Sequence, residues 1–150
     1  MGNWAASVFA SAIEALNSNK QSSNGNFVAA LKSILRYPIK TIAAFILAPI
    51  LAFRITALAK NPLRRIIAGF GLVLATFLAW SAGTFLGATA GALFMANQFG
   101  LIVGLGFLIG TTLSITLSVL FSILVLNSTA WLFLHISTEE VIAYLKSISE

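Results

Sequence analysis

A stretch without a single charged side chain decides the fold; it covers residues 66–134 and reads IIAGFGLVLATFLAWSAGTFLGATAGALFMANQFGLIVGLGFLIGTTLSITLSVLFSILVLNSTAWLFL. Asn97-Gln98 is its clearest polar interruption. On either side of it the sequence predicts two long transmembrane helices, 66–96 and 99–126, joined as an antiparallel hairpin. At 1.5 Å per residue these helices would be about 46 Å and about 42 Å long. Both exceed a hydrocarbon core of about 30 Å, so they must tilt, bend or protrude.

Two weaker signals leave the number of spans open. Residues 127–129, Asn-Ser-Thr, form a second polar interruption. A turn near residues 80–83, Trp-Ser-Ala-Gly, would divide the first long helix and produce three short spans. We rank that division lower, because the turn would place little polar chemistry at the membrane interface. Trp80 at mid-helix favours it slightly, since tryptophan often anchors a helix at that interface; Trp4 and Trp131 are further candidate anchors.

The composition of the whole chain excludes an ordinary soluble domain. Of its 150 residues, 59% are hydrophobic and only 9% are charged, whereas soluble domains carry about 25% charged residues. Nine Lys and Arg against four Asp and Glu give a net charge of +5. In a soluble protein this excess would suggest nucleic acid. Here it indicates membrane topology and anionic headgroups, and we expect no nucleic-acid partner.

The residue types that carry most chemistry are scarce. There is no cysteine, one histidine and four carboxylates spread along the chain. We find no metal, nucleophile or phosphate-binding motif, so we expect neither an enzyme nor a cofactor. His135 stands alone after the long uncharged stretch, and we interpret it as an interfacial side chain rather than a ligand or a base.

A third apolar segment, residues 41–59, has two interpretations. Its uncharged part contains Pro49 and is followed by Arg54. The segment is either a kinked span whose Arg54 side chain extends to the headgroups, or a helix–Pro–helix wedge that enters and leaves the membrane on one side. Three domains follow from this division, an N-terminal region 1–40, a membrane region 41–135 and a C-terminal region 136–150.

Short amphipathic helices are expected at both ends of the chain. Residues 4–16 form one, with Asn3 as its cap, and it either lies on the membrane or a partner or docks on the protein's own core. A flexible polar linker, 17–26, leads to a second amphipathic helix, 27–36. The C-terminal helix, 137–149, begins with a capping box, in which Glu140 follows Ser137 by three residues.

Small residues recur every four positions along both long helices. The first row is Gly71, Ala75, Ala79, Gly83, Gly87 and Gly91, and its last three members make GxxxGxxxG. The second row is Gly106, Gly110, Ser114, Ser118 and Ser122, with Gly100 and Gly104 as an additional pair. In lipid, such rows let helix backbones approach closely. They predict tight packing, within one hairpin or between two faces of an oligomer.

The serines of the second row admit a simpler interpretation. A serine hydroxyl in a helix can donate to the carbonyl four residues earlier, which satisfies it without a partner or a pore. Ser114, Ser118 and Ser122 can thus be satisfied within their own helix, and we regard packing as a better explanation of the row than a pore lining.

The positive side chains serve as headgroup contacts and topology signals; besides Arg54 they are Lys32, Arg36, Lys40, Lys60, Arg64 and Arg65. If residues 41–59 span the membrane, Lys20 and the three cations after it oppose Lys60, Arg64, Arg65 and Lys146 across it, and the charges give no direction. If the segment re-enters, all eight lie on one side, which the positive-inside rule assigns to the cytoplasm. This agreement favours the re-entrant interpretation.

Three functional hypotheses follow. The first is a non-enzymatic integral membrane protein that acts as a structural or assembly subunit, as a homo-oligomer or within a larger membrane complex. The second is a small oligomeric, holin-like pore lined by the hydroxyls of Thr112, Thr116 and the three serines. The third is a membrane-shaping hairpin protein. All three place the chain in a bilayer with anionic headgroups; which membrane remains open.

Overall fold

The computed structural model describes residues 1–18, 23–97 and 103–150, and over these the chain is all-helical. In chain order the helices are α1 (Gly2–Leu16), α2 (Ser23–Leu35), α3 (Pro38–Ile55), the 3₁₀ turn η1 (Thr56–Leu58), α4 (Pro62–Asn97), α5 (Val103–Leu134) and α6 (Thr138–Ser149). Three of the described segments are long and apolar enough to cross a membrane, Pro38–Leu58, Pro62–Ala96 and Gly104–Leu134. The expectation of an all-helical chain with long apolar helices is confirmed.

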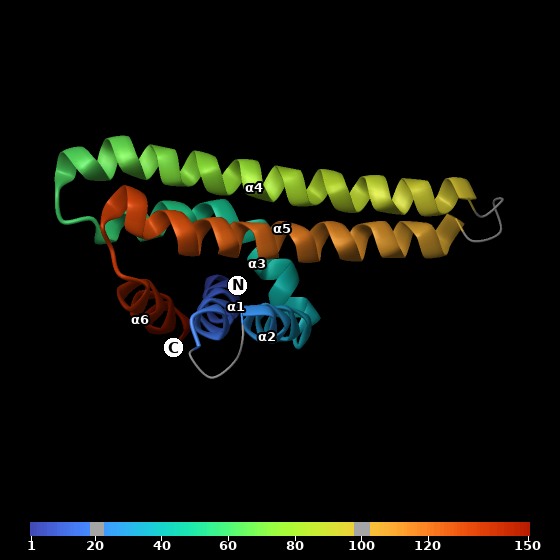
Figure 1. Ribbon diagram of the computed structural model, residues 1–150, viewed down its shortest axis with the longest axis horizontal. Coiled ribbons are helices and arrows are strands. Elements are labelled where there is room, and N and C mark those ends of the chain that lie inside the picture. The colour runs from blue at the N-terminus through green and yellow to red at the C-terminus, as the bar shows by residue number, and fades with distance from the viewer. Residues whose placement is uncertain (19–22, 98–102) are drawn as a thin grey trace.

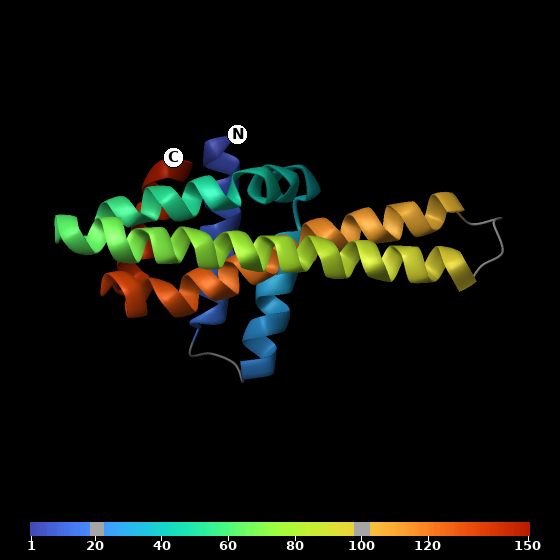
Figure 2. The ribbon, with the colours of Figure 1, turned by 90° about the horizontal axis from the view of Figure 1, so that it is seen from above.

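Two layers make up the molecule (Figure 1). The long helices α4 and α5 lie antiparallel, and α3 packs beside one half of this pair. Helices α1, α2 and α6 form a second layer, in which α1 and α2 cross the long helices (Figure 2). We call the part of the pair covered by these elements, together with them, the body. The ends of α4 and α5 nearest their connection project beyond these elements, and we define the arm as residues 88–97 and 103–111.

Helix α4 begins earlier than expected because its first turn has a good cap. The backbone N–H of Leu63 donates to Asn61 Oδ1 at 3.0 Å. Pro62 occupies the first helical position, where a missing N–H does no harm. Arg64 and Arg65 therefore lie in the first turn of α4, before the expected start at residue 66. The proposed turn at residues 80–83 is wrong, since α4 runs through it.

Helix α5 also continues past its predicted end. Residues 127–129 do not interrupt it, and it reaches Leu134. The Thr129 hydroxyl donates to the Val125 carbonyl at 2.5 Å, within the same helix. The polar run is thus accommodated by local hydrogen bonds. The helix ends at His135, whose φ of 52° is the left-handed conformation that commonly stops a helix.

Helix α3 is one helix through Pro49. The helix–Pro–helix reversal is therefore wrong as an interpretation of residues 41–59. Pro38 is its first residue, a position that tolerates the missing N–H. Eighteen residues at 1.5 Å each separate its two ends by about 27 Å.

Helix α1 packs against α2, α3 and α6. Its apolar face is fully buried at Ala5, Phe9 and Ile13. Of the two alternatives, docking on the protein's own core is the one that the structure has. The expected cap at Asn3 is wrong, because the helix already begins at Gly2, with no side-chain cap.

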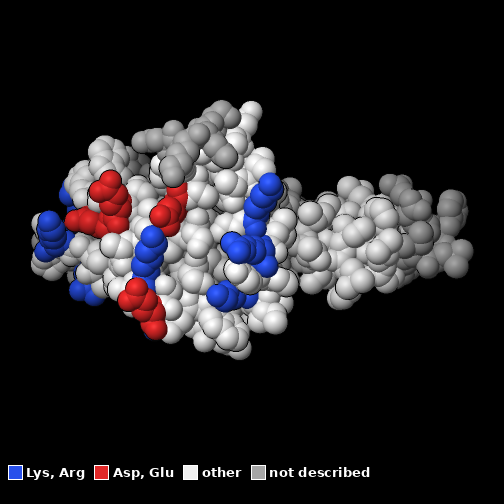
Figure 3. Space-filling view, turned by 90° about the horizontal axis from the view of Figure 1, so that it is seen from below, with Lys and Arg blue, Asp and Glu red and all other residues white. Residues whose placement is uncertain are grey.

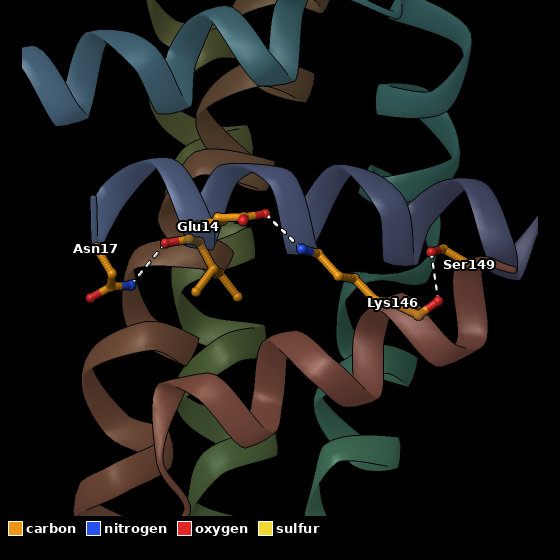
Figure 4. Close-up of polar contacts among 5 residues, drawn as sticks. Glu14, Asn17, Lys146 and Ser149 are labelled. Atoms are coloured by element: carbon orange, nitrogen blue, oxygen red, sulfur yellow. Dashed lines mark hydrogen bonds and ion pairs between the residues drawn. The ribbon is translucent and has the colours of Figure 1, made fainter. Parts of the chain in front are cut away.

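The C-terminal helix α6 follows its prediction closely. Ser137 Oγ accepts from the Glu140 backbone N–H at 3.2 Å, and Glu140 Oε2 accepts from the Ser137 N–H at 3.2 Å, so the capping box is confirmed. The helix lies against α1, where Lys146 Nζ is 3.0 Å from Glu14 Oε2 (Figure 4). These side chains are 52% and 58% exposed, so the ion pair contributes little.

Helix α1 is also linked to the long helices at its C-terminal end. Asn17 Nδ2 donates to Ile13 O at 2.8 Å and to Asn127 Oδ1 at 2.9 Å. Asn127 belongs to the polar run that we had interpreted as a possible break in α5. Its amide accepts a bond from α1, so the two layers are joined there.

Candidate helix-packing site

Three glycines bring α4 and α5 into backbone contact. Gly83, Gly87 and Gly91 are buried and face α5. A Cβ added at Gly83 would lie 2.5 Å from Ser118 N, and one added at Gly91 would lie 2.5 Å from Gly110 Cα. The obstructing atoms belong to the backbone, so no change of side-chain rotamer would make room.

The serines opposite these glycines bond across the interface. Ser114 Oγ donates to Thr84 O at 3.1 Å, and Ser118 Oγ donates to Trp80 O at 3.0 Å. The simpler interpretation, with each hydroxyl bonded to its own helix, is therefore wrong for these two serines. The glycines place the carbonyls of α4 within reach, so the serines use acceptors on the other helix. Thr84 Oγ1 lies 2.8 Å from Ser118 Oγ and extends the network.

Ser122 belongs to the same row but is differently placed. Its hydroxyl is buried and has no hydrogen-bond partner among the described residues. Ser118 and Ser122 thus form a matched pair one turn apart, of which only the first has an acceptor.

We predict that alanine at these two positions affects stability differently. Ser118→Ala removes an interhelical hydrogen bond and should lower the free energy of unfolding by about 1 kcal/mol. Ser122→Ala removes a hydroxyl that is buried without a partner, so stability should stay the same or rise. Unfolding of both variants in detergent micelles measures the difference. Equal destabilisation would mean that the Ser118 bond does not hold the helices together.

The remaining members of the two rows have varied surroundings. A Cβ at Gly71 would be 3.4 Å from the Phe133 ring, and Ala75 and Ala79 are half-buried. Gly106 faces the Met95 side chain, and Gly110 faces Gly91. Gly104 has nothing within 4 Å of an added Cβ, and Gly100 lies outside the described residues. Where the rows meet, they pack within one chain.

Trp80 joins α4 to α3, a contact that we had not predicted. Its indole Nε1 donates to the Phe45 carbonyl at 3.0 Å. In a regular helix that carbonyl accepts from the N–H four residues later, but residue 49 is proline and has none. The Trp80 side chain thus supplies the donor that Pro49 lacks. Its ring also lies 5.2 Å from that of Phe45 and 5.7 Å from that of Phe77.

The predicted headgroup residues separate into two groups near opposite ends of α3. Lys32, Arg36 and Lys40 line a groove of about 770 Å³ between α1 and α2. The second group is exposed around the α3–α4 connection and consists of Arg54, Lys60, Arg64 and Arg65. Blue and red side chains lie on the body in Figure 3, and the described residues of the arm include no charged one.

The hydroxyls that the pore hypothesis requires do not share one face. Ser114 and Ser118 bond α4, whereas Thr112 and Thr116 border a cleft against α2 and α3. His135 is exposed, with its ring 6.0 Å from that of Trp131. Within the described ranges, no three His, Cys, Asp or Glu side chains lie close enough to hold a metal ion.

These features define an all-helical protein whose three long apolar helices suggest integration into a membrane. Comparison with known proteins finds no family model, no curated protein and no solved structure that matches the chain.

Proposed function

We propose that this chain is a non-enzymatic integral membrane protein that acts as a structural or assembly subunit, as a homo-oligomer or within a larger membrane complex. The arm carries the proposal, because it projects beyond the other described helices and exposes large apolar side chains. Phe85, just before the arm, is 71% exposed, and Phe107 within it is 66% exposed. Apolar surface of this kind needs lipid or another apolar helix to cover it.

Glycine contacts within the arm and directly before it make the arm stiff in this proposal. Because Gly87 and Gly91 hold the two helices at backbone distance, they behave as one stiff element. The side chains on the outer faces, among them Leu93 and Leu108, are thereby presented in a fixed arrangement. A rigid apolar surface suits a subunit that positions neighbouring helices.

We propose further that the body lies at the cytoplasmic surface and that the arm enters the bilayer. Helices α1 and α6 carry Glu14 and Lys146 and pack within the body. If α3 crossed the membrane, these helices would carry their charges into hydrocarbon, which is costly. An α3 that stays with the body, outside the hydrocarbon, keeps both basic groups on one side, in agreement with the positive-inside rule.

Single cysteines test this proposal, since the chain has none of its own. Ala92→Cys places a thiol on the exposed surface of the arm, and Ser147→Cys places one on α6. In native membranes, a bismaleimide should cross-link Ala92→Cys to a second copy or to another membrane protein. A membrane-impermeant maleimide added from the cytoplasmic side should label Ser147→Cys and Lys60→Cys but not Ala92→Cys.

Two outcomes would contradict the proposal in different ways. A chain that stays monomeric with cysteine at Ala92 has no assembly role through the arm. Labelling of Lys60→Cys only from the side opposite Ser147→Cys means that α3 crosses the bilayer, which removes the one-sided topology and leaves the assembly role intact.

A further inference from the structure

The groove between α1 and α2 concentrates positive charge. Lys32 comes from α2, Arg36 directly follows that helix, and Lys40 lies at the start of α3. Tyr37 lies between them in sequence, with Arg36 Cζ 5.3 Å and Lys40 Nζ 4.8 Å from its ring centroid. Three hydroxyl side chains, Ser7, Ser11 and Ser33, complete the polar lining.

These cations have no carboxylate partner in the part of the chain that the structure describes. The ion pair found there joins Glu14 to Lys146, between α1 and α6. The groove lining contains no Asp or Glu, and the first turn of α3 has no acidic residue. That turn adds the positive end of the helix dipole. The groove is therefore electrostatically complementary to an anion. The hydroxyls of Ser11 and Ser33 can donate to phosphate oxygens, whereas that of Ser7 donates to the Trp4 carbonyl at 2.8 Å.

An apolar cleft adjoins the groove. It has a volume of about 140 Å³ and lies between α2, α3 and α5. Leu35 lines both the groove and the cleft, so the two are neighbours at that side chain. The lining of the cleft includes Ile42 and Ile115, and two exposed residues, Ile46 and Ile50, extend the apolar surface along α3. A cationic, hydroxyl-bearing surface thus lies on one side of Leu35 and an apolar surface on the other.

From this juxtaposition we infer that the chain holds one anionic phospholipid. Its phosphate lies among Lys32, Arg36 and Lys40, and an acyl chain lies in the cleft beside Ile42. The place in the fold agrees with this ligand, because the groove lies where the charged body meets the uncharged arm (Figure 3). A headgroup there would sit at the membrane surface that the proposed function gives the body. The lipid is an addition to that function, and a subunit without it could still assemble.

The test measures phosphatidylglycerol and phosphatidylcholine of equal chain length, bound to the full-length protein in mixed micelles. We expect about one tightly held phosphatidylglycerol per chain and no comparable retention of phosphatidylcholine. The triple variant Lys32→Gln/Arg36→Gln/Lys40→Gln should lose affinity for phosphatidylglycerol by about 100-fold, because each interfacial cation strengthens binding by about fivefold.

A matched triple variant, Lys60→Gln/Arg64→Gln/Arg65→Gln, removes the same charge at the other end of α3. That end lies beyond a screening length of about 8–10 Å, so affinity should change by no more than about twofold. Thr116→Phe fills the cleft. It should weaken the binding of the diacyl lipid and leave any binding of glycerol phosphate unchanged. Circular dichroism of each variant confirms that the helices are retained.

Several results would overturn the inference. If the two triple variants lose equal affinity for phosphatidylglycerol, the lipid is attracted by the overall positive charge and not by the groove. Competition by inorganic phosphate at the concentration of the lipid would make the ligand a free anion. Retention of a polyglutamate peptide but not of phosphatidylglycerol would assign the groove to an acidic protein segment.

Discussion

Replacement of Gly87 by leucine is expected to separate α4 from α5 and to be the most damaging single change considered. A Cβ at this position would lie 2.7 Å from Leu113 C and closer still to the Ser114 backbone. Side-chain movement cannot relieve contact with backbone, so the helices must move apart. The separation would sacrifice close packing and the bonds of Ser114 and Ser118, with a loss of about 4 kcal/mol in the free energy of unfolding.

The control for this experiment is the same substitution at Gly104. Nothing lies within 4 Å of a Cβ added there, and the residue is exposed near the start of α5. Gly104→Leu should be neutral or stabilising by up to about 1 kcal/mol, since leucine favours the helix. Both variants are unfolded by denaturant in the same micelles. If they lose equal stability, the glycine contacts between α4 and α5 do not determine the fold.

The pairing of the long helices could be anticipated because its cause is local. Small residues every four positions mark a helix face, and a short connection makes neighbouring helices antiparallel. The partners of Ser114 and Ser118 could not be predicted, because they depend on how closely two backbones approach. Sequence spacing shows that a carbonyl lies four residues earlier. It does not show that a second helix brings another carbonyl nearer.

The packing of α1, α2 and α6 into a second layer also could not be predicted from the sequence. An amphipathic pattern shows that one face of residues 4–16 is covered, but lipid, a partner and the chain's own core would produce the same pattern. The groove, too, depends on tertiary packing that the pattern does not show. The sequence marks Lys32, Arg36 and Lys40 only as headgroup and topology signals, and the groove exists because α1 packs beside α2.

Pro49 is the sequence signal for the contact of Trp80 with α3, but we interpreted this proline only as a kink or a reversal. A proline inside an apolar helix removes an N–H and leaves a carbonyl four residues earlier without its usual donor. In a membrane such a carbonyl requires another donor, which neighbouring helices often supply. Pro49 therefore implied a donor near Phe45. The sequence could not identify Trp80 as that donor, because the register of α3 on α4 depends on tertiary packing.

This relationship makes a prediction about two substitutions together. Trp80→Phe keeps an aromatic ring beside Phe45 but removes the indole N–H, so the Phe45 carbonyl loses its donor. We expect a loss of about 2 kcal/mol in the free energy of unfolding, the range for a buried polar group left unpaired. In a Pro49→Ala background, the introduced alanine provides a backbone N–H for that carbonyl. Trp80→Phe should then cost less than about 1 kcal/mol.

The double-mutant cycle isolates this compensation from the packing of the ring, because the ring changes identically in both backgrounds. Trp131→Phe provides a comparison at an exposed tryptophan and should alter stability by no more than about 0.5 kcal/mol. If Trp80→Phe costs the same with proline and with alanine at position 49, the indole does not substitute for the missing N–H. A coupling of about 1 kcal/mol or more would instead mean that α3 tolerates its internal proline because α4 supplies the donor. The uninterrupted course of α3 through Pro49 would then be a property of the packed pair rather than of the α3 sequence alone.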